Sequence, residues 1–236
     1  MKFACSSGAF DRAFRSGDLT QLEFLDAAAR EIGCDGVVLD DRHFPRIDDD
    51  YLAQLKKAAT DLGLSIAALA SDEFFVAGEV TMHDAIERAR ALGAPVLSGR
   101  LGNETALTWS EQLDKLGAAA ALAKAANVTL ALRNAPGSFA ATVHDCKRVT
   151  KETDSAWLRY GLDPAVFDAA SDASALAPKT VLLWWDAREP VRLRGWEDFR
   201  GFAVLDRGDG DATTTEMRDA IFRWKIARDE FELNRA

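Results

Sequence analysis

Val128–Leu132, with the sequence VTLAL, runs directly into Arg133 and Asn134, and this short apolar run ending in polar residues decides the fold. The pattern recurs in Trp157–Asp163 (WLRYGLD), Thr180–Asp186 (TVLLWWD) and Phe202–Asp206 (FAVLD). Short apolar runs that alternate with longer helical patterns are typical of buried parallel strands. If such strands close into a barrel, their C-terminal ends meet around one pocket, where α/β barrels carry their chemistry.

Strand-like and helical patterns alternate along the whole chain. The expected strands are Lys2–Ser6, Cys34–Leu39, Leu64–Ala70, Pro95–Gly99, Val128–Leu132, Trp157–Asp163, Thr180–Asp186 and Gly201–Asp206. Amphipathic periodicity predicts helices over Leu19–Ile32, Asp49–Leu62, Glu79–Leu92, Ser110–Ala126, Ala141–Glu152, Ala165–Leu176 and Thr214–Glu232. Residues 187–200 contain Pro190 and Gly195, so any helix there is short.

These eight units predict a protein of the α/β class with a single (β/α)8 TIM barrel over residues 1–236, because about 250 residues is typical of that fold. An open doubly wound sheet is the alternative, but no Gly-x-Gly-x-x-Gly motif follows any strand. Capping-box patterns at Thr108 and Thr213, and a looser one at Asp18, mark helix starts rather than function.

Composition limits the classes of partner. The 236 residues carry a formal net charge of −9, which argues against binding to nucleic acid. No apolar run reaches the roughly 18 residues of a membrane span, and Met1 leads directly into a strand without a signal peptide, so we expect a cytoplasmic protein. The cysteines Cys5, Cys34 and Cys146 are interpreted as buried free thiols.

Polar residues stand at the ends of several predicted strands. Side chains two apart on a strand share a face, so Arg133 shares the barrel interior with the smaller Ala131 and Thr129. By the same rule Asp163 and Asp206 point into the mouth of the barrel. Asp40 and Arg100, at the ends of the second and fourth strands, are expected to join them.

This cluster has two interpretations. In the first, Arg133 forms an internal ion pair with Asp163 or Asp206 and has no catalytic role. In the second, Arg133 acts with Arg100 or Arg42 to bind the phosphate or carboxylate of a small anion. The sequence leaves both interpretations open.

Further candidates follow the second, fifth and seventh strands. His43 is the one histidine outside the predicted helices, and its near-neutral pKa suits proton transfer; the alternative is a loop residue that packs on its neighbours. Trp185 and Asp186 are expected ligand contacts because a sugar ring can stack on an indole, although such a tryptophan pair can also be simple core. Asn134 is a candidate by position alone.

The phrases AREIGCDGVVLD, KAANVTLALRNAPGSF, LRYGLDP and FRGFAVLD resemble the xylose isomerase-like TIM barrels of the sugar phosphate isomerase/epimerase family. That family also includes the endonuclease IV type of repair enzyme. The resemblance implies a divalent metal held by Glu, Asp, His and Glu on strands five to eight, and these positions fall on Arg133, Asp163, Leu183 and Asp206. A further family glutamate on strand two falls on Val38.

Only the Asp163 match is intact, which predicts a degenerate metal site. Leucine has no lone pair to donate, and the guanidinium of Arg133 is a permanent cation with no acceptor. We therefore expect no metal and no other cofactor at this site. The resulting hypothesis is a sugar or sugar-phosphate isomerase/epimerase that works without the family metal, with Asp163, Asp206 or His43 transferring the proton and Arg133 stabilising the enolate charge.

Two other hypotheses remain. A noncatalytic descendant would bind a small metabolite or a protein partner at the same mouth, in keeping with the loss of both family glutamates. A repair endonuclease is the least supported, because that branch binds several zinc ions through many histidines and this chain has three. The sequence defines neither a particular substrate nor an oligomeric state.

Overall fold

Eight parallel strands form a closed barrel in the order β1 to β8, with β8 pairing back onto β1. The computed structural model describes residues 1–168, 172–193, 195–196 and 198–233. The strands are β1 (Lys2–Ser6), β2 (Gly36–Asp40), β3 (Ser65–Ala70), β4 (Val96–Arg100), β5 (Thr129–Arg133), β6 (Leu158–Leu162), β7 (Thr180–Asp186) and β8 (Phe202–Asp206). The predicted (β/α)8 fold is confirmed.

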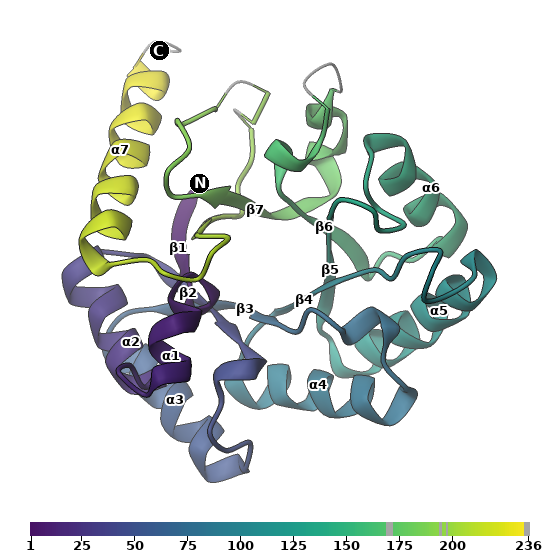
Figure 1. Ribbon diagram of the computed structural model, residues 1–236, viewed down its shortest axis with the longest axis horizontal. Coiled ribbons are helices and arrows are strands. Elements are labelled where there is room, and N and C mark those ends of the chain that lie inside the picture. Colours follow the sequence, from purple (N-terminus) through teal and green to yellow (C-terminus); the bar gives the residue numbers. More distant parts are fainter. Residues whose placement is uncertain (169–171, 194, 197, 234–236) are drawn as a thin grey trace.

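Helices surround the barrel on most of its circumference (Figure 1). They are α1 (Asp11–Ser16), α2 (Gln21–Ala27), α3 (Asp49–Asp61), α4 (Glu79–Leu92), α5 (Trp109–Ala126), α6 (Val143–Thr153) and α7 (Thr214–Leu233). A π-helical segment, Ala28–Ile32, continues α2, and short 3-10 turns occur at Ser7–Phe10, Asp41–His43 and Phe74–Val76. The capping boxes expected at Thr108 and Thr213 are present. The box expected at Asp18 is instead formed by Thr20 with Glu23, so α2 begins at Gln21.

The short helix predicted near Ala165–Leu176 is described only in part, because residues 169–171 lie outside the described residues. The described residues there form two 3-10 helices, Pro164–Val166 and Ala173–Lys179. The first stops because Phe167 is extended, with ψ at 153°, and the second contains Pro178 in its last turn. Among the described residues between β7 and β8 no helix forms either, so this side of the barrel is covered by turns and loops (Figure 1).

Side chains of the strands divide between two apolar regions. The barrel interior holds one large side chain, Trp184, among mainly smaller ones. The smaller residues are Ala4, Val38, Ala67, Ala68, Ala70, Val96, Ala131, Leu182 and Val204. The larger core lies between the strands and the helices, and includes Phe3, Leu39, Leu183 and Trp185. Small interior residues leave room for long side chains at the mouth.

Candidate active site

Charged side chains line the C-terminal ends of the strands. Arg100, the last residue of β4, pairs in register with Arg133, the last residue of β5. Asp186 and Asp206 end β7 and β8 and are likewise register partners. The closure of the barrel therefore sets two arginines on one side of the mouth and two aspartates on the other, as the sequence predicted for Arg100, Arg133 and Asp206.

Asp40 faces the same mouth from β2. A Cβ atom added to Gly8 would lie 3.7 Å from a carboxylate oxygen of Asp40 and 3.7 Å from one of Asp206. The Ser6 hydroxyl accepts the Gly8 N–H at 3.1 Å. Gly8 thus lies between the two carboxylates, and the absence of a side chain there keeps this edge of the mouth open.

Arg133 is the central cation of the mouth. One terminal nitrogen of its guanidinium donates to Asp206 Oδ2 at 2.8 Å, and the two side chains are 15% and 14% exposed. The guanidinium carbon lies 3.8 Å from the ring centre of Trp184, a cation–π contact. The ion pair that the sequence allowed between Arg133 and Asp206 is present.

The structure reverses the expected roles of the two tryptophans on β7. Trp184 faces the barrel interior, whereas Trp185 faces the helices and packs on Trp224 of α7 with ring centroids 4.8 Å apart. The expected mouth contact at Trp185 is therefore wrong. Leu183 also faces outward, as the alternation of side chains along a strand requires, so the position that the resemblance assigned to the family histidine does not face the barrel interior.

Asp163 directly follows β6 and is electrostatically coupled to the mouth. Burial raises the pKa of its carboxyl above the ordinary value, and nearby Asp206 and Asp186 act in the same direction. The N–H of Ala165 and the charge of Arg133 oppose this shift without cancelling it. The surroundings of Asp163 thus favour the protonated form of its carboxyl group.

Asn134 holds the end of β6 rather than facing the mouth. Its side-chain nitrogen donates to the carbonyl oxygen of Asp163 at 2.9 Å, and its side-chain oxygen accepts the N–H of Asp163 at 2.7 Å. Asn134 is buried, so both of its polar atoms are committed to the backbone. The expected ligand contact at Asn134 is therefore corrected to a positioning role for Asp163.

The two other predicted arginines, Arg42 and Arg100, differ in how strongly they are bound by neighbouring carboxylates. Arg42 binds Asp40 through two nitrogens, at 2.9 and 2.5 Å, which raises the pKa of the guanidinium further. Among the described residues, the ion pair of Arg100 is a loose one, 3.4 Å from Asp72. Burial and the neighbouring charge of Arg133 lower the pKa of Arg100, the opposite direction to Arg42. A ligand anion would gain more from Arg100 than from Arg42.

His43 does not reach the mouth. Its Nδ1 lies 3.1 Å from the Ser7 hydroxyl and its Nε2 lies 3.0 Å from Asp11, while the ring stacks on Phe14 at 4.3 Å. The Ser7 hydroxyl accepts the N–H of Asp40 at 2.8 Å. The side chain of His43 is 2% exposed, so both ring nitrogens serve the packing of the segment after β1. The predicted proton-transfer role of His43 lacks support in this geometry.

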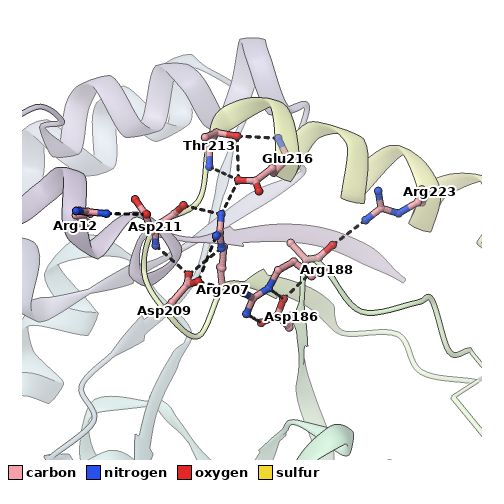
Figure 2. A network of polar contacts seen from close by, with 10 residues as sticks. Arg12, Asp186, Arg188, Arg207, Asp209, Asp211, Thr213, Glu216 and Arg223 are labelled. Carbon is pink, nitrogen blue, oxygen red and sulfur yellow. Dashed lines mark hydrogen bonds and ion pairs between the residues drawn. The ribbon is translucent and has the colours of Figure 1, made fainter.

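Asp186 belongs to a network that fixes the loop after β8 (Figure 2). Arg188 donates to both oxygens of Asp186, at 3.0 and 2.8 Å, and lowers the pKa of that carboxyl. Arg207 binds Asp209 at 2.8 Å and Glu216 at 2.7 Å (Figure 2). Asp186 is therefore already bound within this network. The expected ligand contact would require a free carboxylate there.

The side chains of the mouth do not fit the divalent metal that the family resemblance implies. Guanidinium and indole groups carry only donors, so neither Arg133 nor Trp184 can ligate a cation. Asp206, which could, already binds Arg133. Within the part of the chain that the structure describes, no group of three or more His, Cys, Asp or Glu side chains is arranged to hold a metal ion.

Three interior residues below the mouth were not among the candidate site residues chosen from the sequence. Ser98 on β4, Gly161 on β6 and Trp184 on β7 face one another inside the barrel. Strand alternation was the available signal, because each stands two residues before a polar strand end: Arg100, Asp163 and Asp186.

The fold and the mouth define the class of protein: a (β/α)8 barrel with charged side chains at the C-terminal ends of its strands. The model of the xylose isomerase-like TIM barrel family matches residues 27–178, more than half of the chain. The chain belongs to this family. No curated protein matches its sequence.

Solved structures with the same fold include sugar epimerases. A D-psicose 3-epimerase from Clostridium cellulolyticum H10 is 13% identical with a TM-score of 0.78, covering 97% of this chain and 99% of that chain. An L-ribulose 3-epimerase is 16% identical with a TM-score of 0.73, covering 100% and 98%. The probable 3-DHS dehydratase AsbF from Bacillus anthracis is 15% identical with a TM-score of 0.72, covering 92% and 98%. At such identities the similarity shows the fold alone.

None of the described helices is both long enough and apolar enough to cross a bilayer.

Proposed function

We propose that the barrel mouth binds a small sugar or sugar phosphate and moves a proton at the carbon beside its carbonyl group, as an isomerase or epimerase, without a divalent metal. The observation that carries this proposal is a fixed cation, Arg133, paired with Asp206 at the end of β5, next to the strand β6 that leads into Asp163, a carboxyl group of raised pKa. Membership of the xylose isomerase-like family and the fold shared with sugar epimerases support the reaction class.

Asp163 is the proposed proton-transfer group. A raised pKa brings a carboxyl group nearer to the operating pH, where it can both accept and return a proton. Its carboxylate would remove the proton from the carbon beside the carbonyl; the electron pair of that C–H bond would form a carbon–carbon double bond, and the π pair of the carbonyl would move onto its oxygen. Returning the proton to the neighbouring carbon, while the hydroxyl proton moves between the two oxygens, gives isomerisation. Epimerisation requires return of a proton to the opposite face, which needs a second proton donor on that face.

Arg133 is proposed to stabilise the oxygen on which negative charge develops. Its guanidinium keeps donors beyond the one that binds Asp206, since it carries five N–H groups. Asp206 holds the guanidinium in place, which makes it a positioning residue in this scheme. A preorganised cation in a shielded site is among the larger contributions to catalysis of this kind.

Arg100 is proposed to bind the anionic group of a phosphorylated or acidic ligand. Its ion pair with Asp72 is loose at 3.4 Å, and its neighbour in the sheet is the like-charged Arg133. An anion between the two guanidiniums would relieve their repulsion. Binding through paired guanidinium groups is a common solution for phosphate and carboxylate.

A noncatalytic binding protein is the second candidate. It is favoured by the Arg133–Asp206 ion pair, which neutralises one of the two expected proton-transfer carboxylates. In that case the same mouth would bind the metabolite without turning it over. We also expect the protein to act in the cytoplasm and not on nucleic acid, and the net charge of −9 supports the second expectation.

The direct test is exchange of carbon-bound hydrogen. The protein is incubated in D2O with ketoses, aldoses and their phosphates, and deuterium at the carbon beside the carbonyl is measured by NMR and mass spectrometry. We expect exchange with at least one sugar in the presence of a chelator, and a fall of about 100-fold or more in Asp163→Asn. Asp114→Asn, on the exposed face of α5, is the matched control.

The outcomes separate the candidates. Binding of a sugar without any exchange would favour the noncatalytic protein. Exchange that survives in Asp163→Asn would remove Asp163 from the mechanism, and exchange that requires an added divalent ion would contradict the metal-free site.

A further inference from the structure

The terminal helix α7 carries apolar side chains on two faces. The face toward the barrel is buried and contains Met217, Ala220, Ile221 and Trp224. Phe222, Ile226 and Leu233 follow one another at spacings of four and seven residues, which places them together on the opposite face of the helix. These three residues form the outer face of α7. A surface helix of a globular protein normally has one apolar face and one polar face, so α7 is unusual.

The outer face of α7 is exposed. Phe222, Ile226 and Leu233 are 64%, 41% and 78% accessible to solvent. The other large apolar side chains that are exposed in the described part of the chain lie on separate segments: Leu22 on α2, Ile47 before α3 and Val80 on α4. Single exposed apolar residues are normal on a soluble protein, whereas several on one face mark an interaction site. The outer face is therefore a surface on which a partner would gain apolar contacts.

Charge is distributed unevenly along α7. Residues 218–225 carry three basic side chains and one acidic one, whereas residues 226–233 carry one basic and three acidic ones. The macrodipole of a helix is negative at its C-terminal end, so acidic side chains there are unfavourable. The last turn of the described helix holds Glu230 and Glu232 and no basic residue. The charges of α7 thus do not compensate its own dipole at this end.

An antiparallel second copy of α7 would match this distribution. The basic half of one helix would lie beside the acidic half of the other, and the two macrodipoles would point in opposite directions, which is favourable for neighbouring helices. Arg218 can take part in such a contact, because its side chain is 55% exposed and its ion pair with Asp219 is loose at 3.5 Å. Arg223 and Lys225 instead donate to backbone carbonyl oxygens of their own subunit. Charge complementarity therefore favours this chain itself as the partner.

We infer that the outer face of α7 is the interface of a homodimer, in which two α7 helices pack antiparallel about a two-fold axis. Such a contact is isologous, so every pair of residues occurs twice. With the axis between Phe222 and Ile226, Phe222 packs on Ile226 of the partner subunit. Arg218 then lies opposite Glu232 of the partner subunit, and Leu233 lengthens the apolar contact at both ends. The dimer does not depend on the reaction proposed at the barrel mouth.

The size of the interface sets its strength. One pair of helices is a small contact, and interfaces below about 1,200 Å² in total are typically weak or transient. Monomer and dimer should therefore exchange, with a Kd in the micromolar range.

Sedimentation velocity measures this Kd for the full chain and its variants between about 0.5 and 200 µM. Phe222→Glu places a charge at the centre of the outer face. Val80→Glu, the same kind of change at a 76% exposed position of α4, is the matched control. Arg218→Glu and Glu232→Arg each reverse one member of the pair between the subunits, and the double variant restores opposite charges. Thermal unfolding of each variant shows whether its fold is intact.

We expect Phe222→Glu to raise the dimer Kd about 100-fold or more, because the two-fold symmetry buries two unpaired carboxylates. Each single charge reversal should raise Kd about tenfold, and the double variant should return to within about threefold of the wild type. Val80→Glu should dimerise as the wild type does. Because Phe222 is exposed in the subunit, the melting temperature of dilute Phe222→Glu should match that of dilute wild type.

Three outcomes would overturn the inference. The first is a wild type that stays monomeric at about 200 µM. The second is a dimer that persists in Phe222→Glu, because another surface would then hold it. The third is a double charge reversal that dimerises no better than the single ones, which would exclude the antiparallel arrangement.

A lipid surface is another occupant that an apolar helix face can have. Sedimentation with vesicles of phosphatidylcholine and phosphatidylserine tests it. A monomeric wild type that sediments with these vesicles, while Phe222→Glu does not, would overturn the dimer and assign the outer face to a membrane surface.

Discussion

Arg133 at the end of β5 reaches across the barrel mouth to Asp206 at the end of β8, with 2.8 Å between nitrogen and oxygen. Neither strand is adjacent to the other in the sheet, so the ion pair connects opposite parts of the barrel. Both side chains are largely buried, which separates this pair from the exposed pairs on the helices. Buried pairs respond strongly to the removal of one partner.

Replacing Arg133 should therefore destabilise the protein. We expect Arg133→Met to lower the free energy of unfolding by about 3 kcal/mol, because Asp206 would remain buried without its counter-ion. Adding Asp206→Asn should restore a substantial part of that loss. Urea unfolding of the four proteins in the double-mutant cycle measures the coupling.

The control is the exposed pair of Arg30 with Asp26 on the surface of the second helical segment. Arg30→Met should change the unfolding free energy by less than about 1 kcal/mol. A coupling energy between Arg133 and Asp206 as small as that of the exposed pair would contradict a structural role for the buried one.

Replacing the Asp163 carboxylate by an amide should stabilise the fold. Its pKa is raised in the folded state, so folding favours the protonated carboxyl. As the pH rises from the unfolded-state pKa through the folded-state pKa, the unfolded chain releases its proton first and stability declines. Asp163→Asn cannot ionise and should be more stable than the wild type near pH 7. This advantage should vanish below about pH 3.5, where the carboxyl is protonated in both states.

Chemical unfolding across that pH range, with Asp114→Asn as the reference, measures the effect. An Asp163→Asn protein that is less stable at neutral pH would show that the carboxylate is stabilised in the folded state, against the direction of the shift. Together with the deuterium exchange, a stabilising but inactivating Asp163→Asn would identify a residue retained for function at a cost in stability.

His43 should matter to folding and not to proton transfer. His43→Ala removes contacts to Ser7 and Asp11 and the stacking on Phe14, and we expect a loss of about 2 to 4 kcal/mol in unfolding free energy. His83→Ala, on the exposed face of α4, should have almost no effect. Thermal unfolding gives the comparison. A His43→Ala protein of wild-type stability that has lost deuterium exchange would restore the catalytic interpretation.

Arg207 should hold the loop after β8 in place. It binds Asp209, Glu216 and the carbonyl oxygen of Asp211, while its side chain is 15% exposed (Figure 2). Arg207→Ala should increase hydrogen exchange at the amides of Gly210 and Ala212, whose hydrogen bonds close the loop.

Arg12→Ala, which removes one exposed ion pair to Asp211 in the same network, is the matched control. We expect the amides of the loop to remain protected in that variant, since exposed pairs contribute little. Equal exchange in the two variants would mean that Arg207 is not what fixes the loop.

The sequence was most informative where periodicity carries the signal. Eight apolar runs separated by amphipathic helices predicted the barrel, and the last residues of those runs predicted the charges at its mouth. The failures lie where long-range contacts decide. Nothing in the sequence near His43 indicates that Ser7 and Asp11, from the segment after β1, bind both nitrogens of its ring.

The error at Trp185 has a different origin. Both tryptophans of β7 are apolar, so burial preference does not distinguish them. The alternation that placed Arg133 beside Ala131 also places Trp184 on the same face as Asp186. Applied to β7, it would have placed Trp184 inside the barrel and both Leu183 and Trp185 outside.

The guanidinium of Arg133 is part of the polypeptide, whereas a metal ion is acquired after folding and can dissociate or be exchanged. The mouth therefore carries its positive charge as soon as the chain has folded, whatever ions the surroundings supply. Scarcity of metal cannot remove this positive charge, and a competing ion cannot replace it. In a barrel built in this way the cation is a side chain of the protein itself, so its presence does not depend on the supply of metal ions.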